Sequence, residues 1–212
     1  MVSLTDALYR ATESLVEEDL GAMVLSLEDL PDVLSGFELA REGLLDNEDM
    51  ASHGFPGSTT GEVRSAGRIT GYLREFATPL DPSSLRAGAD LITATVVHLF
   101  HKGHQVSDWM SNKFLGEFQH FAGKELGGGQ RLIRADQVDY DGFSDEAVGL
   151  RTLQTTYSGM VSSDVVDFRI GRLLGVAYVV TLGEGKRDGL VGQLGIALEK
   201  RMVGVLLGAG RQ

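Results

Sequence analysis

The last third of the chain constrains its fold more than any other part. It contains three segments rich in β-branched and other strand-forming residues, at 147–155, 164–170 and 173–182. Only Gly171 and Arg172 separate the last two segments, and a two-residue loop that begins with glycine suits a type II′ hairpin turn. Strands joined by so short a turn pair antiparallel. A helical apolar pattern follows at residues 190–205, so this region predicts a sheet with a helix packed on it.

Further strands and helices are predicted ahead of that region. Alternation and β-branched content indicate strands at residues 36–45, 68–77, 90–101 and 131–139. Apolar residues at three- and four-residue steps predict an opening amphipathic helix within residues 4–20 and a long middle helix from Val106 to Phe121. Because most strands are joined by turns too short for a crossover, we expect an α+β fold, with a single largely antiparallel β-sheet and flanking α-helices.

The length of 212 residues favours one domain with extensions. We expect residues 1–22 to form an N-terminal amphipathic helix and residues 23–212 to form a single α+β domain. No apolar run approaches the roughly 18 residues of a membrane span. No secretory signal opens the sequence, so we expect either a cytoplasmic protein or an extracytoplasmic one whose export segment precedes Met1.

The acidic composition excludes some partners. Lys and Arg number 19 and Asp and Glu number 30, so the net charge is −11. This charge repels a polyphosphate backbone and argues against nucleic-acid binding. The chain has no cysteine, which excludes disulfides, thiolate metal sites and a cysteine nucleophile. No cofactor is predicted.

Three histidines, His98, His101 and His104, lie at three-residue steps and could share a divalent metal if the backbone brought them together. On a continuous strand His98 and His101 would point to opposite faces, and Lys102 would oppose cation binding. We therefore predict no metal site and expect solvated histidines at a strand end.

No motif for catalysis is present. Acidic pairs such as Asp145 and Glu146 are abundant, but in so acidic a chain solvated carboxylates explain them. The serines lack the G-x-S-x-G elbow of a hydrolase nucleophile, and the segment GKELGGGQRL fits neither a phosphate loop nor a dinucleotide fingerprint. We therefore predict a protein that is not an enzyme.

Two segments are candidates for binding. The polar, glycine-rich stretch 47–63 is longer than folding requires, and we assign a binding loop to its residues His53, Phe55, Ser58 and Thr59. The middle helix carries an aromatic stripe of Trp109, Phe114, Phe118 and Phe121. Together with Met110, the side chains of this stripe are predicted to be buried against the sheet. The alternative is that Trp109, Phe114 and Phe118 line a cavity for a small apolar ligand.

Two parts of the sequence resemble a known group of proteins. The segment LSLEDLPDVLSGFELAREGLLDNEDMA resembles the opening of bacterial exported proteins, and GFSDEAVGL followed by VVDFRIGRLLGVAYVV resembles their closing half. This group includes LpqN-type lipoproteins and PknH-like extracellular sensor domains, and its members resemble the PsbP-like fold group. The resemblance implies an antiparallel sheet flanked by helices and a binding, sensing or accessory role.

The sequence is thus interpreted as a non-catalytic bacterial binding, sensor or accessory module, extracytoplasmic if an export signal was removed. Its partner would be an unidentified protein or a small apolar ligand. The alternative is a structural protein that acts through homo-oligomerisation, and a third reading is a hydrolase with a carboxylate or histidine site. A large apolar-walled pocket would favour ligand binding over both of these alternatives.

Overall fold

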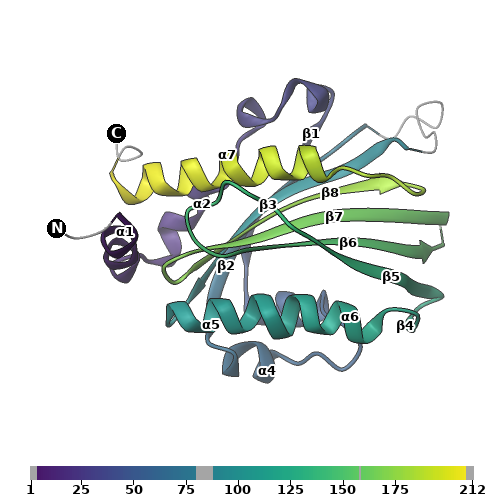
Figure 1. Ribbon diagram of the computed structural model, residues 1–212, viewed down its shortest axis with the longest axis horizontal. Helices are drawn as coiled ribbons and strands as arrows, with labels where there is room; N and C mark the ends of the chain where they lie inside the picture. The colour runs from purple at the N-terminus through teal and green to yellow at the C-terminus, as the bar shows by residue number, and fades with distance from the viewer. Residues whose placement is uncertain (1–3, 80–87, 158, 209–212) are drawn as a thin grey trace.

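A computed structural model describes residues 4–79, 88–157 and 159–208 of the chain. Within these ranges eight strands form a single sheet in the order β1-β2-β3-β8-β7-β6-β5-β4, and every neighbouring pair is antiparallel (Figure 1). The strands are β1 (Glu38–Leu45), β2 (Arg68–Ala77), β3 (Asp90–Phe100), β4 (Glu125–Gly127), β5 (Gln130–Val138), β6 (Ala147–Thr156), β7 (Gly159–Ile170) and β8 (Leu173–Leu182). The predicted α+β fold with one antiparallel sheet is confirmed.

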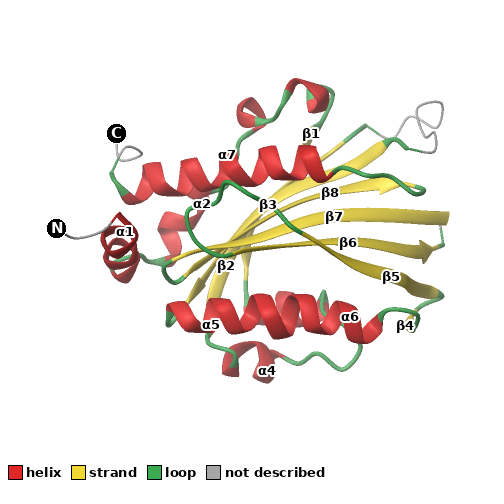
Figure 2. Ribbon diagram, in the orientation of Figure 1, coloured by secondary structure: helices red, strands yellow, loops and turns green. Residues whose placement is uncertain are grey.

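Helices cover both faces of the sheet (Figure 2). The long C-terminal helix α7 (Asp188–Leu206) lies on one face with α1 (Leu4–Glu13) and α2 (Leu20–Met23). The other face carries α3 (Asn47–Ser52), α4 (Thr60–Ser65), α5 (Gly103–Asp108), the π-helix η4 (Trp109–Gly116) and α6 (Glu117–Phe121). We call these two sides the α7 layer and the pocket layer.

Short 3-10 turns complete the chain ahead of β1. They are η1 (Glu17–Asp19), η2 (Leu27–Asp29) and η3 (Asp32–Leu34). The expected opening helix therefore ends at Glu13, and Leu20 begins a second one. Leu8, Leu15 and Leu20 all belong to the main apolar cluster under α7, so the N-terminal segment packs on the sheet.

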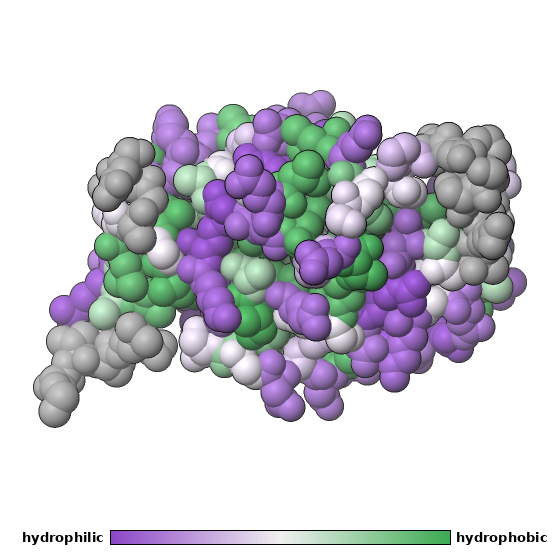
Figure 3. Space-filling view, turned by 90° about the horizontal axis from the view of Figure 1, so that it is seen from above, coloured by the Kyte–Doolittle hydropathy of each residue, from purple (hydrophilic) through white to green (hydrophobic). Residues whose placement is uncertain are grey.

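The α7 layer is a close-packed apolar core. The side chains of Val191, Leu194, Leu198 and Met202 are fully buried on α7. They face sheet residues such as Val166 and Phe168. Seen from this side, hydrophilic and hydrophobic residues interleave across the surface (Figure 3). Among the described helices, none is both long and apolar enough to cross a membrane.

The turn between β7 and β8 has the geometry that the sequence predicts. Gly171 has a φ of +57°, whereas no non-glycine residue in the described ranges has a positive φ. A positive φ at the first loop residue only is the pattern of a type II′ turn. The pairing of Ile170 with Leu173 closes the hairpin.

The stretch 47–63 is more ordered than the predicted loop. Asp46 caps α3 by accepting hydrogen bonds from the backbone amides of Glu48 and Asp49, both at 2.8 Å. Thr59 and Glu62 form a capping box at the start of α4. Both capping patterns are present in the sequence, but the glycines and Pro56 between them indicate a loop. Two such short helices were therefore not predicted. The segment 53–59 joins α3 to α4.

Candidate functional site

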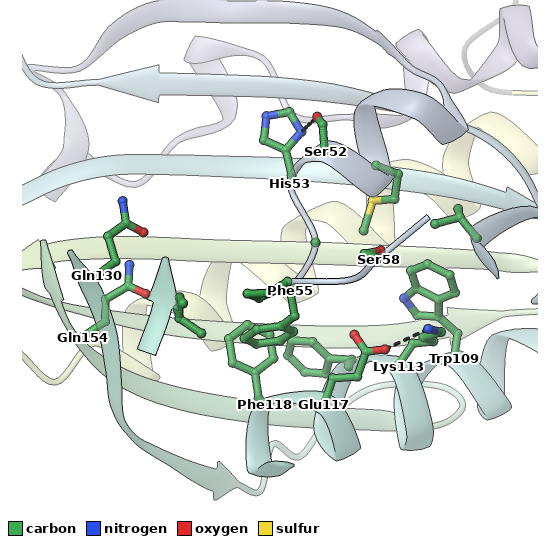
Figure 4. A pocket seen from close by; sticks show the side chains of 16 residues that line it. Ser52, His53, Phe55, Ser58, Trp109, Lys113, Glu117, Phe118, Gln130 and Gln154 are labelled. Carbon is green, nitrogen blue, oxygen red and sulfur yellow. Dashed lines mark hydrogen bonds and ion pairs between the residues drawn. The ribbon is translucent and has the colours of Figure 1, made fainter. Parts of the chain in front are cut away.

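A cavity of about 580 Å³ lies in the pocket layer, between the 53–59 segment and the helical run that contains η4 and α6 (Figure 4). Its size falls in the range of small-molecule sites. The apolar part of its wall is made by Met50, Phe55, Pro56, Val63, Trp109, Phe114, Phe118 and Leu126. The polar part is made by Ser52, His53, Ser58, Lys113, Glu117, Gln130 and Gln154.

The cavity brings together the two candidate segments that the sequence suggested separately. From the assigned binding loop, His53, Phe55 and Ser58 lie on its wall. From the aromatic stripe, Trp109, Phe114 and Phe118 also lie on its wall. Figure 4 shows Trp109 and Phe118 on the helical run, opposite the 53–59 segment. Thr59 lies outside the wall and its hydroxyl accepts the backbone N–H of Glu62 at 3.2 Å. Residues distant in sequence thus form one site.

The π-helix explains how the aromatic residues face one cavity. Nine residues make about two and a half turns of a regular α-helix, which would place Trp109 and Phe118 on opposite sides. A π-helix is bonded from residue i to i+5 and turns less per residue. Because η4 spans Trp109–Gly116, the wider turns bring Trp109, Phe114 and Phe118 to the same side.

Aromatic contacts hold the 53–59 segment on the helical run. The ring of Phe55 stacks on that of Phe121 at 4.5 Å between centroids, and meets the edge of Phe118 at 4.7 Å. The prediction that the whole stripe is buried against the sheet is therefore wrong. Met110 and Trp109 are buried, whereas Phe114, Phe118 and Phe121 are half-buried because they face the segment and the cavity.

A buried cation fixes α3 to the sheet beside the cavity. The guanidinium of Arg68 donates hydrogen bonds to Asn47 Oδ1 and Leu45 O, both at 2.6 Å, and to His98 Nδ1 at 3.1 Å. Burial lowers the pKa of Arg68 to about 10, and the carboxylates of Asp46 and Asp49 oppose that shift. Since Asn47 opens α3, this network positions the helix that carries part of the cavity wall.

The three histidines are not brought together. His98 is buried on β3, while His101 and His104 are exposed. The expectation of a solvated His98 is wrong, because its ring lies under the pocket layer beside Arg68. Burial and then the charge of Arg68 hold the pKa of His98 well below its usual range. In the part of the chain that the structure describes, no group of three or more potential metal ligands is found.

A second buried ionisable group lies in the same layer. Asp167 on β7 is 2% exposed, and its Oδ1 has no hydrogen-bond partner within the described residues. Its neighbours across the sheet, Val148 and Val176, pack against the apolar cluster under α5 and η4. Burial raises the pKa of Asp167 well above its usual range. Burial therefore favours the neutral form of this carboxyl group over the ionised form.

The charges on the cavity wall cancel. Lys113 Nζ lies 2.8 Å from Glu117 Oε1. His53 Nδ1 lies 2.7 Å from the carbonyl oxygen of Asp49. Gln130 and Gln154 come from neighbouring strands β5 and β6 and lie side by side at one end of the cavity (Figure 4). These two glutamines and the ion pair were not predicted, because single polar residues on strands and helices form no recognisable sequence pattern.

Comparison with known proteins places the fold. No family model matches the chain, and no curated protein matches it. The extracellular domain of PknH from Mycobacterium tuberculosis matches with a TM-score of 0.58 at 12% identity, over 89% of this chain and 97% of that one. This chain shares the fold of that domain. The predicted resemblance to PknH-like extracellular sensor domains is thereby confirmed at the level of the fold.

A second solved structure is more distant. It is a putative uncharacterized protein, an Rv0999 ortholog, from Mycobacterium smegmatis. Its TM-score is 0.40 at 9% identity, over 100% of this chain and 98% of that one.

Proposed function

We propose that this protein is a non-catalytic binding domain of the sensor type, which takes a small molecule into the cavity between the 53–59 segment and η4–α6. The observation that carries the proposal is the convergence of aromatic side chains from two distant segments on one cavity of about 580 Å³. Concave sites of this size, lined by aromatic side chains with a few polar groups, are typical of small-molecule binding.

The wall chemistry supports binding rather than catalysis. Glu117 is the only carboxylate on the described wall, and it is paired with Lys113. A general base or nucleophile would need a partner that activates it within hydrogen-bond reach. Ser52 Oγ and His53 Nδ1 lie 3.5 Å apart on the wall, but each is bonded to the carbonyl oxygen of Asp49 at 2.7 Å, so the serine proton and this ring nitrogen are both engaged there. The buried Asp167 and His98 lie in the sheet and are not among the residues of the wall.

The fold supports a place outside the cytoplasm. The PknH domain with which this chain shares its fold is described as extracellular. By analogy, we place this protein outside the cytoplasm of a bacterium, as a sensing or accessory module. Fold analogy alone carries this part of the proposal.

Trp109 allows a direct test, because it is the chain's single tryptophan and it lines the cavity. The neutral apolar dye N-phenyl-1-naphthylamine should bind saturably, and energy transfer from Trp109 should report its binding. Phe118→Ala removes one aromatic wall and should weaken dye binding about five- to tenfold, since an aromatic contact is worth about 1 kcal/mol.

Phe143→Ala is the matched control. Phe143 is also half-buried and also contacts another ring, that of Phe168 at 5.0 Å, but it lies in the α7 layer. This variant should bind the dye as the parent does. Absence of saturable transfer, or equal weakening by both substitutions in folded protein, would exclude the proposed site.

A further inference from the structure

The cavity wall offers hydrogen-bonding groups without a free charge. The two charged side chains on it, Lys113 and Glu117, neutralise each other at 2.8 Å. Placing a charged ligand group there would remove it from water without a counter-charge, which is costly. The protein's net charge of −11 would attract a cation from a distance, but the wall offers no unpaired carboxylate to receive it, since Glu117 is paired with Lys113.

Uncharged polar groups on the wall remain available. The side-chain amides of Gln130 and Gln154 make no hydrogen bond to any other group in the described ranges. Both amides lie at the same end of the cavity, in neighbouring strands (Figure 4). A primary amide offers donors and an acceptor together, so two adjacent amides match hydroxyl or amide groups of a ligand.

The middle of the cavity is apolar. Figure 4 shows Phe55 and Phe118 between the two glutamines at one end and Trp109 at the other. The rings of Phe114 and Phe118 meet edge to face, with 5.6 Å between their centroids, so the wall offers both ring faces and ring edges to a ligand. Aromatic side chains provide large apolar contact areas for aliphatic chains and rings.

We infer that the occupant is an uncharged amphipathic molecule, whose hydroxyl-bearing head bonds to Gln130 and Gln154 while its apolar body lies along Phe55, Phe114 and Phe118. This inference rests on the proposed function of the same cavity. It assigns a recognition role to two glutamines and excludes fatty-acid anions and ammonium amphiphiles as preferred ligands.

The test compares three amphiphiles with the same eight-carbon chain. Octyl glucoside has an uncharged hydroxyl head, octyl sulfate is an anion and octyltrimethylammonium is a cation. Each is titrated below its micelle concentration against protein that holds the naphthylamine dye. Octyl glucoside should displace the dye at a concentration at least tenfold lower than either charged probe.

Glutamine variants test whether the two side-chain amides cause the preference for octyl glucoside. Gln130→Leu with Gln154→Leu should reduce the glucoside advantage at least fivefold, with the displacement by each probe referred to the dye affinity of that variant. Gln137→Leu, an exposed glutamine on β5 outside the cavity wall, is the matched control and should keep the full advantage. Thermal melting of each variant verifies that it is folded.

The outcomes separate this inference from the function on which it rests. If the dye binds but a charged probe displaces it as well as octyl glucoside, the inference is overturned and the binding function stands. The same holds if no octyl probe displaces the dye, or if the advantage survives in the double glutamine variant. If the dye itself does not bind, both are overturned.

Discussion

The two faces of the sheet differ in what they bury. In the α7 layer the buried carboxylates have partners: Asp164 accepts from Arg151 Nε at 2.7 Å, and Glu199 accepts from the Ser144 hydroxyl at 2.7 Å. In the pocket layer Asp167 has an unpaired oxygen, and Arg68 is bonded to neutral groups. That layer also contains the cavity. One layer therefore pairs its buried carboxylates over an apolar core, and the other leaves a carboxyl oxygen unpaired and contains the candidate site.

This contrast predicts where stability is concentrated. A packed apolar layer contributes most of the free energy of folding, whereas functional regions are usually less well packed. Substitutions of similar size should therefore cost more under α7 than on the cavity wall, while ligand binding should respond in the opposite order. The following variants test each half of that statement.

The largest loss of stability is expected from Leu198→Ala in α7. Leu198 is fully buried, and removing its side chain leaves a cavity that costs about 2–5 kcal/mol. Denaturant unfolding measures this loss, and Phe118→Ala should cost less because Phe118 is half-buried. Dye affinity of the folded Leu198→Ala protein should equal that of the parent. A larger loss from Phe118→Ala would show that the aromatic wall is core.

Gly171→Val tests how the β7–β8 hairpin meets the N-terminal segment. At a φ of +57° a β-branched residue is strained, which costs about 1–3 kcal/mol. An added Cβ would also lie 2.6 Å from Thr12 Oγ1. Gly36→Val is the control, since nothing lies within 4 Å of a Cβ there and its φ is not positive. Equal melting temperatures for both variants would contradict the assigned turn.

The β7–β8 hairpin was predictable because its signals are local. Gly171 with Arg172 sets the turn, and β-branched residues set the strands, so the predicted limits of β8 are those of the structure. The limits of β2 agree as well. By contrast, β7 begins at Gly159 and not at residue 164, and the three-residue β4 was not predicted, since short or polar strand segments carry little pattern.

The candidate site was predictable only in parts. Phe55 and Phe118 were each named from their own segments, but their contact depends on tertiary packing that no local pattern encodes. The π-helix was missed because steps of three and four residues fit an α-helix. Asp167 alternates with apolar residues, which indicates a solvent-facing side chain, yet helices cover that face of the sheet too.

Asp167→Asn tests the unpaired carboxyl of the pocket layer through its pH dependence. The folded pKa is raised above the ordinary value near 4, so between those two values only the unfolded chain is ionised. The parent therefore loses stability from this group as the pH rises above about 4. Asparagine does not titrate, so the stability of the variant relative to the parent should increase from pH 4 to pH 8. A constant difference would exclude a buried neutral acid.

His98→Gln tests a second buried titratable group of the pocket layer, whose effect on stability has the opposite pH dependence. The folded pKa of His98 is depressed, so below pH about 6.5 the unfolded chain binds a proton that the folded protein does not. The parent therefore loses stability from this group as the pH falls through that value. Between pH 7 and pH 5 the unfolding free energy should fall less steeply for the variant. Identical slopes would mean that His98 can take up a proton in the folded state.

Lys113→Gln should have the smallest effect on stability and a visible effect on binding. A partly exposed pair four residues apart on a helix contributes about 0.5 kcal/mol, so melting should hardly change. The substitution leaves Glu117 uncompensated on the cavity wall, and octyltrimethylammonium should then displace the dye at a severalfold lower concentration than in the parent. Glu117→Gln should favour octyl sulfate, and the double variant should restore the parent's preference. If the charged probes do not respond in these opposite directions, the ion pair does not face the ligand. Ligand recognition in the pocket layer would then depend on the aromatic and amide groups alone.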